Sequence, residues 1–327
     1  MPPDARRITA RAARLVTHGE PLTIDEVELP EPSPGELIVD MAFGGVNPVD
    51  RYGALGRVAV DGPLPRTLGS EGSGFVDGDR HVIVRGHGLG SMRDGLWATH
   101  AVVPADALID IPTGVRLEAA AALGIAGVTA WRTVTELARV TTDDRVLVLG
   151  ASGGVGSMIV SIVHRIGATV WGQTGDAAKV PFVAARGAEH VAVTSGQDGE
   201  MASFVAELAE LRPTVVFDPL GGPFFGAAVE AMAPRGRLVA FGTSADSSGL
   251  VPLQALYRKS LRVIGYGGLM ESDAAIAAGI EDALRALGDE RLEVCVDSLV
   301  PLADVNDAFA RLVDRSVRGK LVLDLRG

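Results

Sequence analysis

Six short runs rich in β-branched residues recur through the middle of the chain. Each has one central valine, and these valines stand at positions 146, 170, 191, 215, 239 and 263. Successive valines are therefore 24, 21, 24, 24 and 24 residues apart. A strand of about five residues, a helix of about ten and two short loops fill such a period. Because the runs are continuously apolar, they predict an α/β chain with a doubly wound, six-stranded parallel sheet.

The expected strands alternate with segments of helical spacing. Apolar residues recur every three or four positions in Met158–Ile166 and Met201–Leu211, as on one face of a helix. The six strands are expected at Arg145–Gly150, Thr169–Gln173, His190–Val193, Thr214–Asp218, Gly236–Gly242 and Leu261–Gly265.

The first part of the chain has no helical periodicity, and proline and glycine interrupt it, as in PEPSPG at 30–35. This pattern indicates a loop-rich, mainly antiparallel β domain. Its strands are expected at Leu22–Leu29, Glu36–Met41, His81–Val84 and Thr99–Val103.

An alanine-rich segment, Leu117–Leu137, predicts a helix that leads into the parallel sheet. We interpret the tail of the chain as returning to the first domain. The expected domains are residues 1–122 completed by 268–327, and residues 123–267. The elements of the tail are expected as helix Ser272–Leu287, strand Leu292–Leu299, helix Ala303–Asp314 and strand Lys320–Leu325.

Charge and composition exclude several classes of protein. The net charge of −11 argues against a nucleic-acid partner. The single cysteine, Cys295, excludes an internal disulfide and a cysteine-rich zinc lobe. The uncharged apolar run Ala119–Trp131 has 13 residues, fewer than the roughly 18 of a membrane span. The N-terminal segment lacks the apolar core of a secretory signal, and we expect a cytoplasmic protein.

A glycine-rich loop, GASGGVG at 150–156, follows the first strand of the expected sheet and opens a helix. Gly150 permits a tight turn, Gly153 lets the backbone approach a pyrophosphate, and Gly156 lets helix pack on strand. Free N–H groups and the helix dipole then face the anion. A tight turn without a ligand is the alternative. The expected cofactor-binding residues here are Gly150, Ser152, Gly153, Gly154, Val155 and Gly156.

The end of the second expected strand bears on which dinucleotide binds. An NAD site places Asp or Glu there for the ribose hydroxyls, whereas this chain has Thr174 and, five residues later, Lys179. A missing carboxylate and a nearby cation favour a 2′-phosphate, so we expect NADPH. Two alternatives remain: Lys179 is a solvated helix residue, or Asp176 supplies the carboxylate of an NAD site.

Further motifs extend along nearly the whole chain: VNPVD at 46–50, ADALIDIP at 105–112, AAALGIAGVTAW at 120–131, GASGGVGS at 150–157, VVFDPLGG at 215–222, GRLVAFG at 236–242 and GKLVL at 319–323. Together they resemble the medium-chain dehydrogenase/reductase superfamily, and more closely its zinc-free quinone oxidoreductase branch, which includes zeta-crystallin. The resemblance implies a GroES-like catalytic domain and a Rossmann domain.

Zinc-dependent relatives have a catalytic cysteine, a histidine in a Gly-His-Glu triplet and a four-cysteine lobe. Here the triplet reads Gly69-Ser70-Glu71, and the only cysteine stands at 295. A thiolate–imidazole zinc site cannot be assembled from these residues. We therefore expect no metal site and no oxidation of an alcohol through zinc.

The resemblance implies hydride transfer to a quinone or an α,β-unsaturated carbonyl. In this branch the Asn of Asn-Pro-x-Asp lies near the nicotinamide and a following Tyr lines the pocket, which here are Asn47 and Tyr52. Asn47 is expected to donate an N–H to the acceptor carbonyl or to hold the nicotinamide ribose, and Tyr52 to donate a hydrogen bond or a proton. Alternatively, Asn47 only shapes the turn before Pro48, and Tyr52 is only pocket wall. Asp50 is expected to tie down the local loop.

The resemblance also implies cofactor contacts from Gly242 and Thr243 after the fifth strand, Gly268 after the sixth, and Arg315, for which a surface arginine is the alternative.

The chain departs from the branch at several places, and the departures weaken the expectation of quinone specificity and of NADPH affinity. The hairpin near 74–80 is shortened, and Val58 replaces a second pocket tyrosine. Thr194 replaces a tyrosine that helps to hold the 2′-phosphate, and Pro219 replaces a serine.

We predict a zinc-independent, NADPH-dependent reductase of a small quinone or enone. The alternatives are an enoyl-thioester reductase, a non-catalytic NADPH-binding redox sensor or structural protein, and a zinc-free alcohol dehydrogenase whose general base is not evident. The apolar sixth strand predicts a homodimer through edge pairing. No nucleic-acid or membrane partner is expected.

Overall fold

The structure, a computed structural model, describes residues 8–58, 61–197 and 199–326. The chain forms two compact units. The first comprises Met1–Val128, Ser272–Gly288 and Val296–Gly327, and the second comprises Thr129–Glu271 and Asp289–Cys295. Each unit is therefore built from segments that are distant in sequence, and the short segment Asp289–Cys295 lies with the second unit.

The second unit contains a six-stranded parallel sheet with the order β11-β10-β9-β12-β13-β14. The chain begins near the centre of this sheet and winds outward in both directions, which confirms the doubly wound arrangement. Its strands are β9 (Arg145–Val148), β10 (Thr169–Thr174), β11 (His190–Val193), β12 (Val215–Asp218), β13 (Arg237–Ala240) and β14 (Arg262–Gly265).

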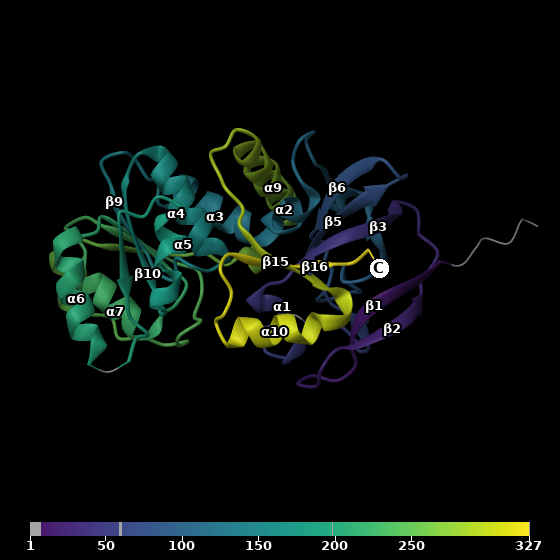
Figure 1. The fold of residues 1–327 in the computed structure, drawn as a ribbon, viewed down its shortest axis with the longest axis horizontal. Coiled ribbons are helices and arrows are strands. Elements are labelled where there is room, and N and C mark those ends of the chain that lie inside the picture. The colour runs from purple at the N-terminus through teal and green to yellow at the C-terminus, as the bar shows by residue number, and fades with distance from the viewer. Residues whose placement is uncertain (1–7, 59–60, 198, 327) are drawn as a thin grey trace, which may run out of the picture. The chain divides into compact units, whose positions relative to one another are not determined.

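Helices pack against this sheet, as the repeat requires. Leu147 on β9 belongs to a buried cluster with Phe204 and Leu208 of α6 and Phe224 of α7. Because α6 and α7 pack side by side, they bury one face of the sheet together (Figure 1). The helices of this unit are α4 (Gly154–Ile166), α5 (Val180–Ala184), α6 (Glu200–Leu211), α7 (Gly222–Ala231) and α8 (Leu253–Arg258).

The first unit contains two sheets, of three strands in the order β2-β1-β4 and of seven strands in the order β15-β16-β3-β5-β6-β8, with β7 also paired to β3. All pairings are antiparallel except β15 with β16. This confirms the mainly antiparallel β domain. Its strands are β1 (Thr9–Leu15), β2 (Thr23–Glu28), β3 (Glu36–Gly45), β4 (Arg66–Thr67), β5 (Glu71–Val76), β6 (Arg80–Arg85), β7 (His100–Pro104), β8 (Leu108–Asp110), β15 (Val296–Pro301) and β16 (Lys320–Asp324).

The helix expected over Leu117–Leu137 is present as a series of short segments. These are α2 (Leu117–Ala121), the π-helical η2 (Leu123–Gly127), α3 (Val128–Arg132) and the π-helical η3 (Thr133–Leu137). The first unit also contains α1 (Pro48–Ala54), α9 (Asp273–Gly288) and α10 (Val305–Val313), whereas α3 after Val128 and all of η3 belong to the second unit.

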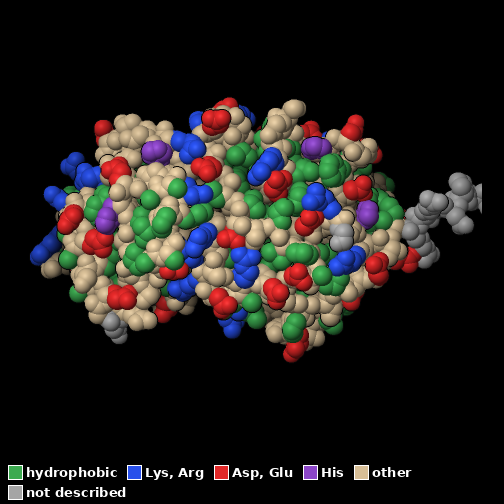
Figure 2. All heavy atoms as spheres, viewed as in Figure 1, with side chains coloured by type: hydrophobic (Ala, Val, Ile, Leu, Met, Phe, Trp, Pro, Cys, Tyr) green, Lys and Arg blue, Asp and Glu red, His purple; other side chains and the backbone are tan. Residues whose placement is uncertain are grey.

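The described helices include none whose length and apolar character suffice for crossing a bilayer. Figure 2 shows acidic and basic side chains interspersed over the face that it presents, with several Lys and Arg side chains together at its left edge. The acidic excess of the sequence is therefore not gathered into one patch on this face.

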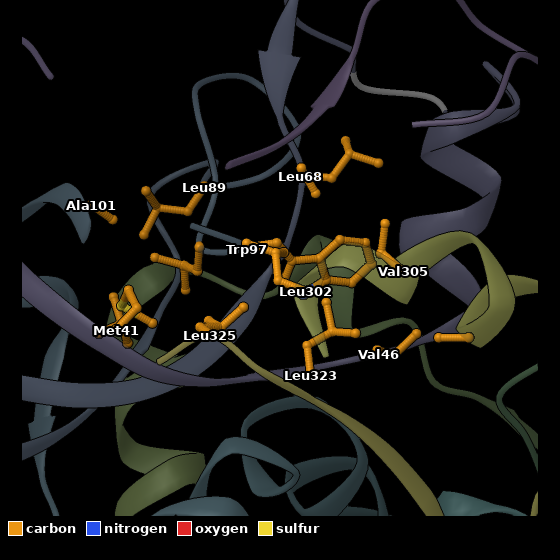
Figure 3. Close-up of a cluster of buried hydrophobic side chains, with 14 of the residues drawn as sticks. Met41, Val46, Leu68, Leu89, Trp97, Ala101, Leu302, Val305, Leu323 and Leu325 are labelled. Atoms are coloured by element: carbon orange, nitrogen blue, oxygen red, sulfur yellow. The ribbon is translucent and has the colours of Figure 1, made fainter. Parts of the chain in front are cut away.

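Trp97 lies at the centre of the first unit's core (Figure 3). Its fully buried ring packs among side chains from both ends of the chain, including Leu68, Leu302 and Leu323, and its Nε1 donates to the Gly45 carbonyl at 3.2 Å. A Cβ on Gly69 would lie 2.4 Å from the indole, so the ring requires glycine there. The tail thus completes the first unit's core, and β16 pairs with β3 beside it.

The strand β14 is an edge of the six-stranded sheet, and its Val263 is 46% exposed. Because an uncovered edge strand offers unpaired N–H and C=O groups, we propose that two copies of the chain pair through β14.

Replacing Val263 and Ile264 together by Lys is expected to turn the dimer into a monomer in light scattering. Val313→Lys alters a valine of similar exposure (52%) on α10 and should leave the dimer intact. A monomeric wild type, or a dimer that survives the double change, would reject edge pairing.

Candidate functional site

The glycine-rich loop joins β9 to α4. Gly150 has a left-handed backbone with φ of 60°, and a Cβ on Gly156 would lie 2.3 Å from the Gly150 carbonyl oxygen. Both positions require glycine for the fold itself. A Cβ on Gly153 would meet that oxygen at 3.4 Å, an ordinary contact. The protein leaves room for a side chain at Gly153, so a glycine there fits the close approach of an outside group.

The start of α4 presents backbone donors. Gly153 is the N-cap and makes no side-chain cap, and Ser157 N–H donates to the Gly153 carbonyl at 2.9 Å as the first helical hydrogen bond. The amides of Gly154, Val155 and Gly156 therefore precede the hydrogen-bond ladder of the helix. Amides in this position, together with the helix dipole, bind phosphate groups. The loop fits the pyrophosphate of a dinucleotide.

The end of β10 carries no carboxylate. Thr174 is buried, and its hydroxyl lies 3.3 Å from that of Ser152, so it joins β10 to the glycine-rich loop. Lys179 ends the short helix η4 (Ala177–Lys179) and is only 6% exposed, so it is not a solvated helix residue. Asp176 caps η4 by accepting from the Ala178 N–H at 2.9 Å. The site thus has a neutral strand end with a buried lysine close by in the chain.

The loops after β12 and β13 are packed together. A Cβ on Gly242 would lie 2.8 Å from the Pro219 carbonyl oxygen, and Ser244 donates to the same oxygen through its N–H and its hydroxyl, both at 3.0 Å. Thr243 stands between Gly242 and Ser244 in the chain, and it is exposed. Ligands of doubly wound sheets bind at this carboxyl edge. Gly268 begins the short helix η5 (Gly268–Met270), which follows β14.

In the first unit, Asn47 is part of a buried polar cluster. Its Nδ2 donates to Glu71 Oε1 at 2.7 Å, and Lys320 Nζ donates to its Oδ1. Lys320 Nζ also lies 2.7 Å from Glu71 Oε1. Glu71 is fully buried, and Lys320 and Asn47 are 4% and 3% exposed. An ion pair that is shielded from water therefore holds both ends of the Asn47 amide.

Two glycines make room for the Glu71 carboxylate. A Cβ on Gly45 would lie 2.3 Å from Oε1, and a Cβ on Gly124 would lie 2.9 Å from Oε2. Oε2 accepts a hydrogen bond of 2.6 Å from the Ile125 N–H in η2. Strand β3, strand β5 and the π-helical segment thus converge on this one carboxylate.

Asp50 ties down the loop before α1, which confirms the expectation. Its carboxylate accepts from the Asn47 N–H at 2.8 Å, from the Ser70 N–H at 3.2 Å and from the Ser70 hydroxyl at 2.7 Å. Burial raises the pKa of Asp50 to about 6, although the hydrogen bond from Ser70 and the charge of Lys320 act in the opposite direction. Ser70 therefore stands in its triplet as a hydrogen-bond donor to Asp50.

Tyr52 and Arg315 also belong to the first unit. Tyr52 lies on α1 and is half-buried, and its hydroxyl makes no hydrogen bond to the part of the chain that the structure describes. Arg315 follows α10, is exposed and has a left-handed backbone with φ of 52°. Asn47 is thus the N-cap of α1, and Tyr52 lies five residues later within the same short helix.

The hairpin near 74–80 is short. Val76 on β5 pairs directly with Arg80 on β6, and only Asp77, Gly78 and Asp79 connect them. At the other departures from the family pattern, the Thr194 hydroxyl donates to Glu200 at 2.9 Å, and Val58 is half-buried.

Across residues 8–58, 61–197 and 199–326, no three His, Cys, Asp or Glu side chains gather in a way that would hold a metal ion. Both oxygens of Glu71 already accept hydrogen bonds from the chain.

Glu71 and Lys320 are functional candidates that the sequence alone did not single out. The sequence did hold a signal, because a lysine directly before the apolar run LVL, on a strand with buried neighbours, needs a partner of opposite charge. Nothing in the sequence indicates that this partner is 249 residues away.

Comparison with known proteins gives consistent relationships. Residues 154–287 match the family model described as zinc-binding dehydrogenase. The chain is 29% identical over 325 residues to a mouse quinone oxidoreductase-like protein 2, covering 97% of this chain and 92% of the relative. It is 30% identical over 317 residues to a phenolphthiocerol/phthiocerol polyketide synthase of Mycobacterium tuberculosis. That match covers 93% of this chain, but the chain spans only 14% of the synthase.

Solved structures are similar over almost the full length. A mycobacterial protein in complex with NADPH has a TM-score of 0.83 and 26% identity, covering 96% of this chain and 99% of the other. A quinone oxidoreductase from Thermus thermophilus, also solved with NADPH, has a TM-score of 0.82 and 27% identity, covering 96% of this chain and all of the other.

The raised pKa of Asp50 makes stability depend on pH. Its ordinary value is 3.8 and its value in the fold is about 6, so the folded state holds a proton that the unfolded state releases in this interval. The stability that Asp50 contributes is present below about pH 4 and is lost as pH rises through about 6, by up to about 3 kcal/mol. Denaturant unfolding between pH 4 and 7 should show this decline in the wild type and not in Asp50→Asn. Parallel pH dependences in the two proteins would contradict the assignment.

Proposed function

Because this chain belongs to the medium-chain dehydrogenase/reductase superfamily, in its quinone oxidoreductase branch, we propose that it reduces a small quinone or an α,β-unsaturated carbonyl with NADPH and without zinc. The chain is an oxidoreductase. One observation carries the zinc-free proposal: Ser70 stands where the zinc-dependent relatives have a histidine, and its N–H and hydroxyl both donate to Asp50. This position therefore offers no imidazole to a metal.

The glycine-rich loop and the end of β10 support NADPH as the cofactor. The amides of Gly154, Val155 and Gly156 would hold its pyrophosphate. The neutral Thr174 and Lys179 would receive its 2′-phosphate. When bound, NADPH supplies the hydride.

The first unit supplies the groups that act on the acceptor. Asn47 would donate its remaining amide N–H to the acceptor carbonyl oxygen, where negative charge develops as the hydride arrives. The Tyr52 hydroxyl, which has no hydrogen-bond partner in the described residues, would donate a hydrogen bond or the proton. An enone thus gains a hydride at its β-carbon and a proton at its α-carbon, and a quinone becomes a hydroquinone.

A second candidate is reduction of an enoyl thioester. Similarity to a segment of a polyketide synthase, at 30% identity over 93% of this chain, favours it. The hydride and proton are delivered in the same way, so the two candidates differ in the group that is attached to the carbonyl.

The acceptor class is tested by cofactor oxidation with purified protein after metal chelation. A quinone, an enone and an enoyl thioester are compared, each with NADPH and with NADH. We expect turnover with NADPH and a quinone or enone, and a loss of about 100-fold in kcat in Tyr52→Phe. The thioester as best acceptor would select the second candidate. No oxidation of either cofactor by any acceptor would reject the reductase and favour a non-catalytic binding protein.

Preference for NADPH is tested by Lys179→Met. Removing the cation beside the 2′-phosphate should lower kcat/KM for NADPH by about 10-fold or more and leave kcat/KM for NADH unchanged, since NADH has no such phosphate. Lys259→Met is the control, because Lys259 Nζ donates to the Glu230 carbonyl at the end of α7. Equal losses with both cofactors would mean that Lys179 is only structural.

A further inference from the structure

We propose that Glu71 and Lys320 are positioning residues that fix the orientation of the Asn47 amide, so that it presents a single N–H to the acceptor. This inference deepens the proposed function and rests on it in one respect, the role of Asn47 as a donor. The sequence motifs assign no such role to either charged residue.

The orientation follows from the chemistry of the two partners. An ammonium group only donates hydrogen bonds, and an ionised carboxylate only accepts them. Lys320 Nζ therefore requires the amide oxygen of Asn47, and Glu71 Oε1, at 2.7 Å, requires its nitrogen. Rotating the amide by half a turn would place its N–H groups against the Lys320 ammonium and its oxygen against the Glu71 carboxylate, so neither hydrogen bond could form. With Lys320 Nζ also 2.7 Å from Glu71 Oε1, the three groups form a closed triangle that allows one orientation.

The triangle leaves one donor unused. The Asn47 amide nitrogen carries two N–H groups, and one of them is bonded to Glu71. The second meets no acceptor within the residues that the structure describes, although Asn47 is only 3% exposed. A buried N–H without an acceptor is unfavourable. The cluster is therefore complete only when an atom from outside the chain, such as a carbonyl oxygen, accepts this hydrogen bond.

The charge arrangement also strengthens that donor. Lys320 donates to the oxygen of the amide, which draws electron density away from its nitrogen and makes the free N–H a better donor. Asp50 is the other titratable group next to Asn47, and it contacts the backbone N–H rather than the amide side chain. Glu71 and Lys320 are thus the charged side chains that contact the amide, and the capping box of α1 adds the backbone N–H of Asp50 on the Asn47 side chain.

A purely structural alternative is that the ion pair only joins β5 to β16. The two roles differ in one respect. A positioning role acts through Asn47, whereas a structural role persists when the Asn47 amide is absent. A double-mutant cycle separates them, because residues that act through one another have non-additive effects.

The cycle compares wild type, Asn47→Ala, the paired change Glu71→Gln with Lys320→Met, and all three changes together, in the full-length protein. The paired change removes both charges, so no unpaired charge stays buried. We expect kcat with the best acceptor to fall about 100-fold in Asn47→Ala and at least 10-fold in the paired change. In the Asn47→Ala background the paired change should alter kcat by less than about 2-fold. NADPH binding, measured by fluorescence, and the melting temperature are followed in every variant, and Lys320→Arg should keep kcat within about 3-fold because arginine also only donates.

The outcomes separate this inference from the function on which it rests. Wild-type kcat in Asn47→Ala would overturn both the donor role of Asn47 and the inference. A different result would overturn the inference and leave the donor role of Asn47 intact. In that case kcat falls in Asn47→Ala, and the paired change lowers kcat by the same factor in the wild-type and the Asn47→Ala backgrounds.

Should the paired variant unfold, Asn47→Asp with Glu71→Gln provides the second test. This swap moves the carboxylate from position 71 to position 47, so the net charge is unchanged. The carboxylate at position 47 can still pair with Lys320, and the amide oxygen at position 71 can still accept from the Ile125 N–H. It leaves no N–H at position 47. A native melting temperature with kcat lowered about 100-fold is expected, and wild-type kcat in the folded swap would overturn the inference.

Discussion

The first unit depends on the buried ion pair between Glu71 and Lys320. It joins β5 to β16 and also engages the start of α1 and the π-helical segment η2. Removing two charges from water costs several kcal/mol for each ion, and their attraction offsets this only when the geometry and the surrounding hydrogen bonds are good. Such a pair contributes specificity more than stability. A shift of β16 against β3 would leave a buried charge unpaired, so the pair fixes the register in which the tail completes the sheet.

The two units solve different chemical problems in different ways. The second unit presents backbone amides at the start of α4, and its essential residues are glycines that permit close approach. The first unit presents side chains, and its glycines make room for one of them, the carboxylate of Glu71. Cofactor recognition thus depends on the path of the main chain. The donors that we propose for the acceptor depend on a network of side chains, in which every member needs its partner.

This difference explains how far the sequence could be interpreted. The parallel strands and the glycine-rich loop were predictable, because periodic apolar runs and backbone requirements are written locally. The strands β1 (TARAARL) and β5 (EGSGFV) were not predicted, because they have few β-branched residues. Strand β5 is rich in glycine because β3 approaches it closely, as at Gly74 beside Asp40. The role of Lys320 and the burial of Lys179 arise from contacts between distant or irregular segments, which a sequence pattern does not record.

The sequence separation of Glu71 and Lys320 also sets an order of folding. The first unit cannot close its charge pair until β16 has been synthesised, after the whole parallel sheet. Glu71 must stay hydrated until then, because a carboxylate is not buried without its counter-ion. The early strands of the first unit therefore cannot reach their final packing around Glu71 until the last strand is available.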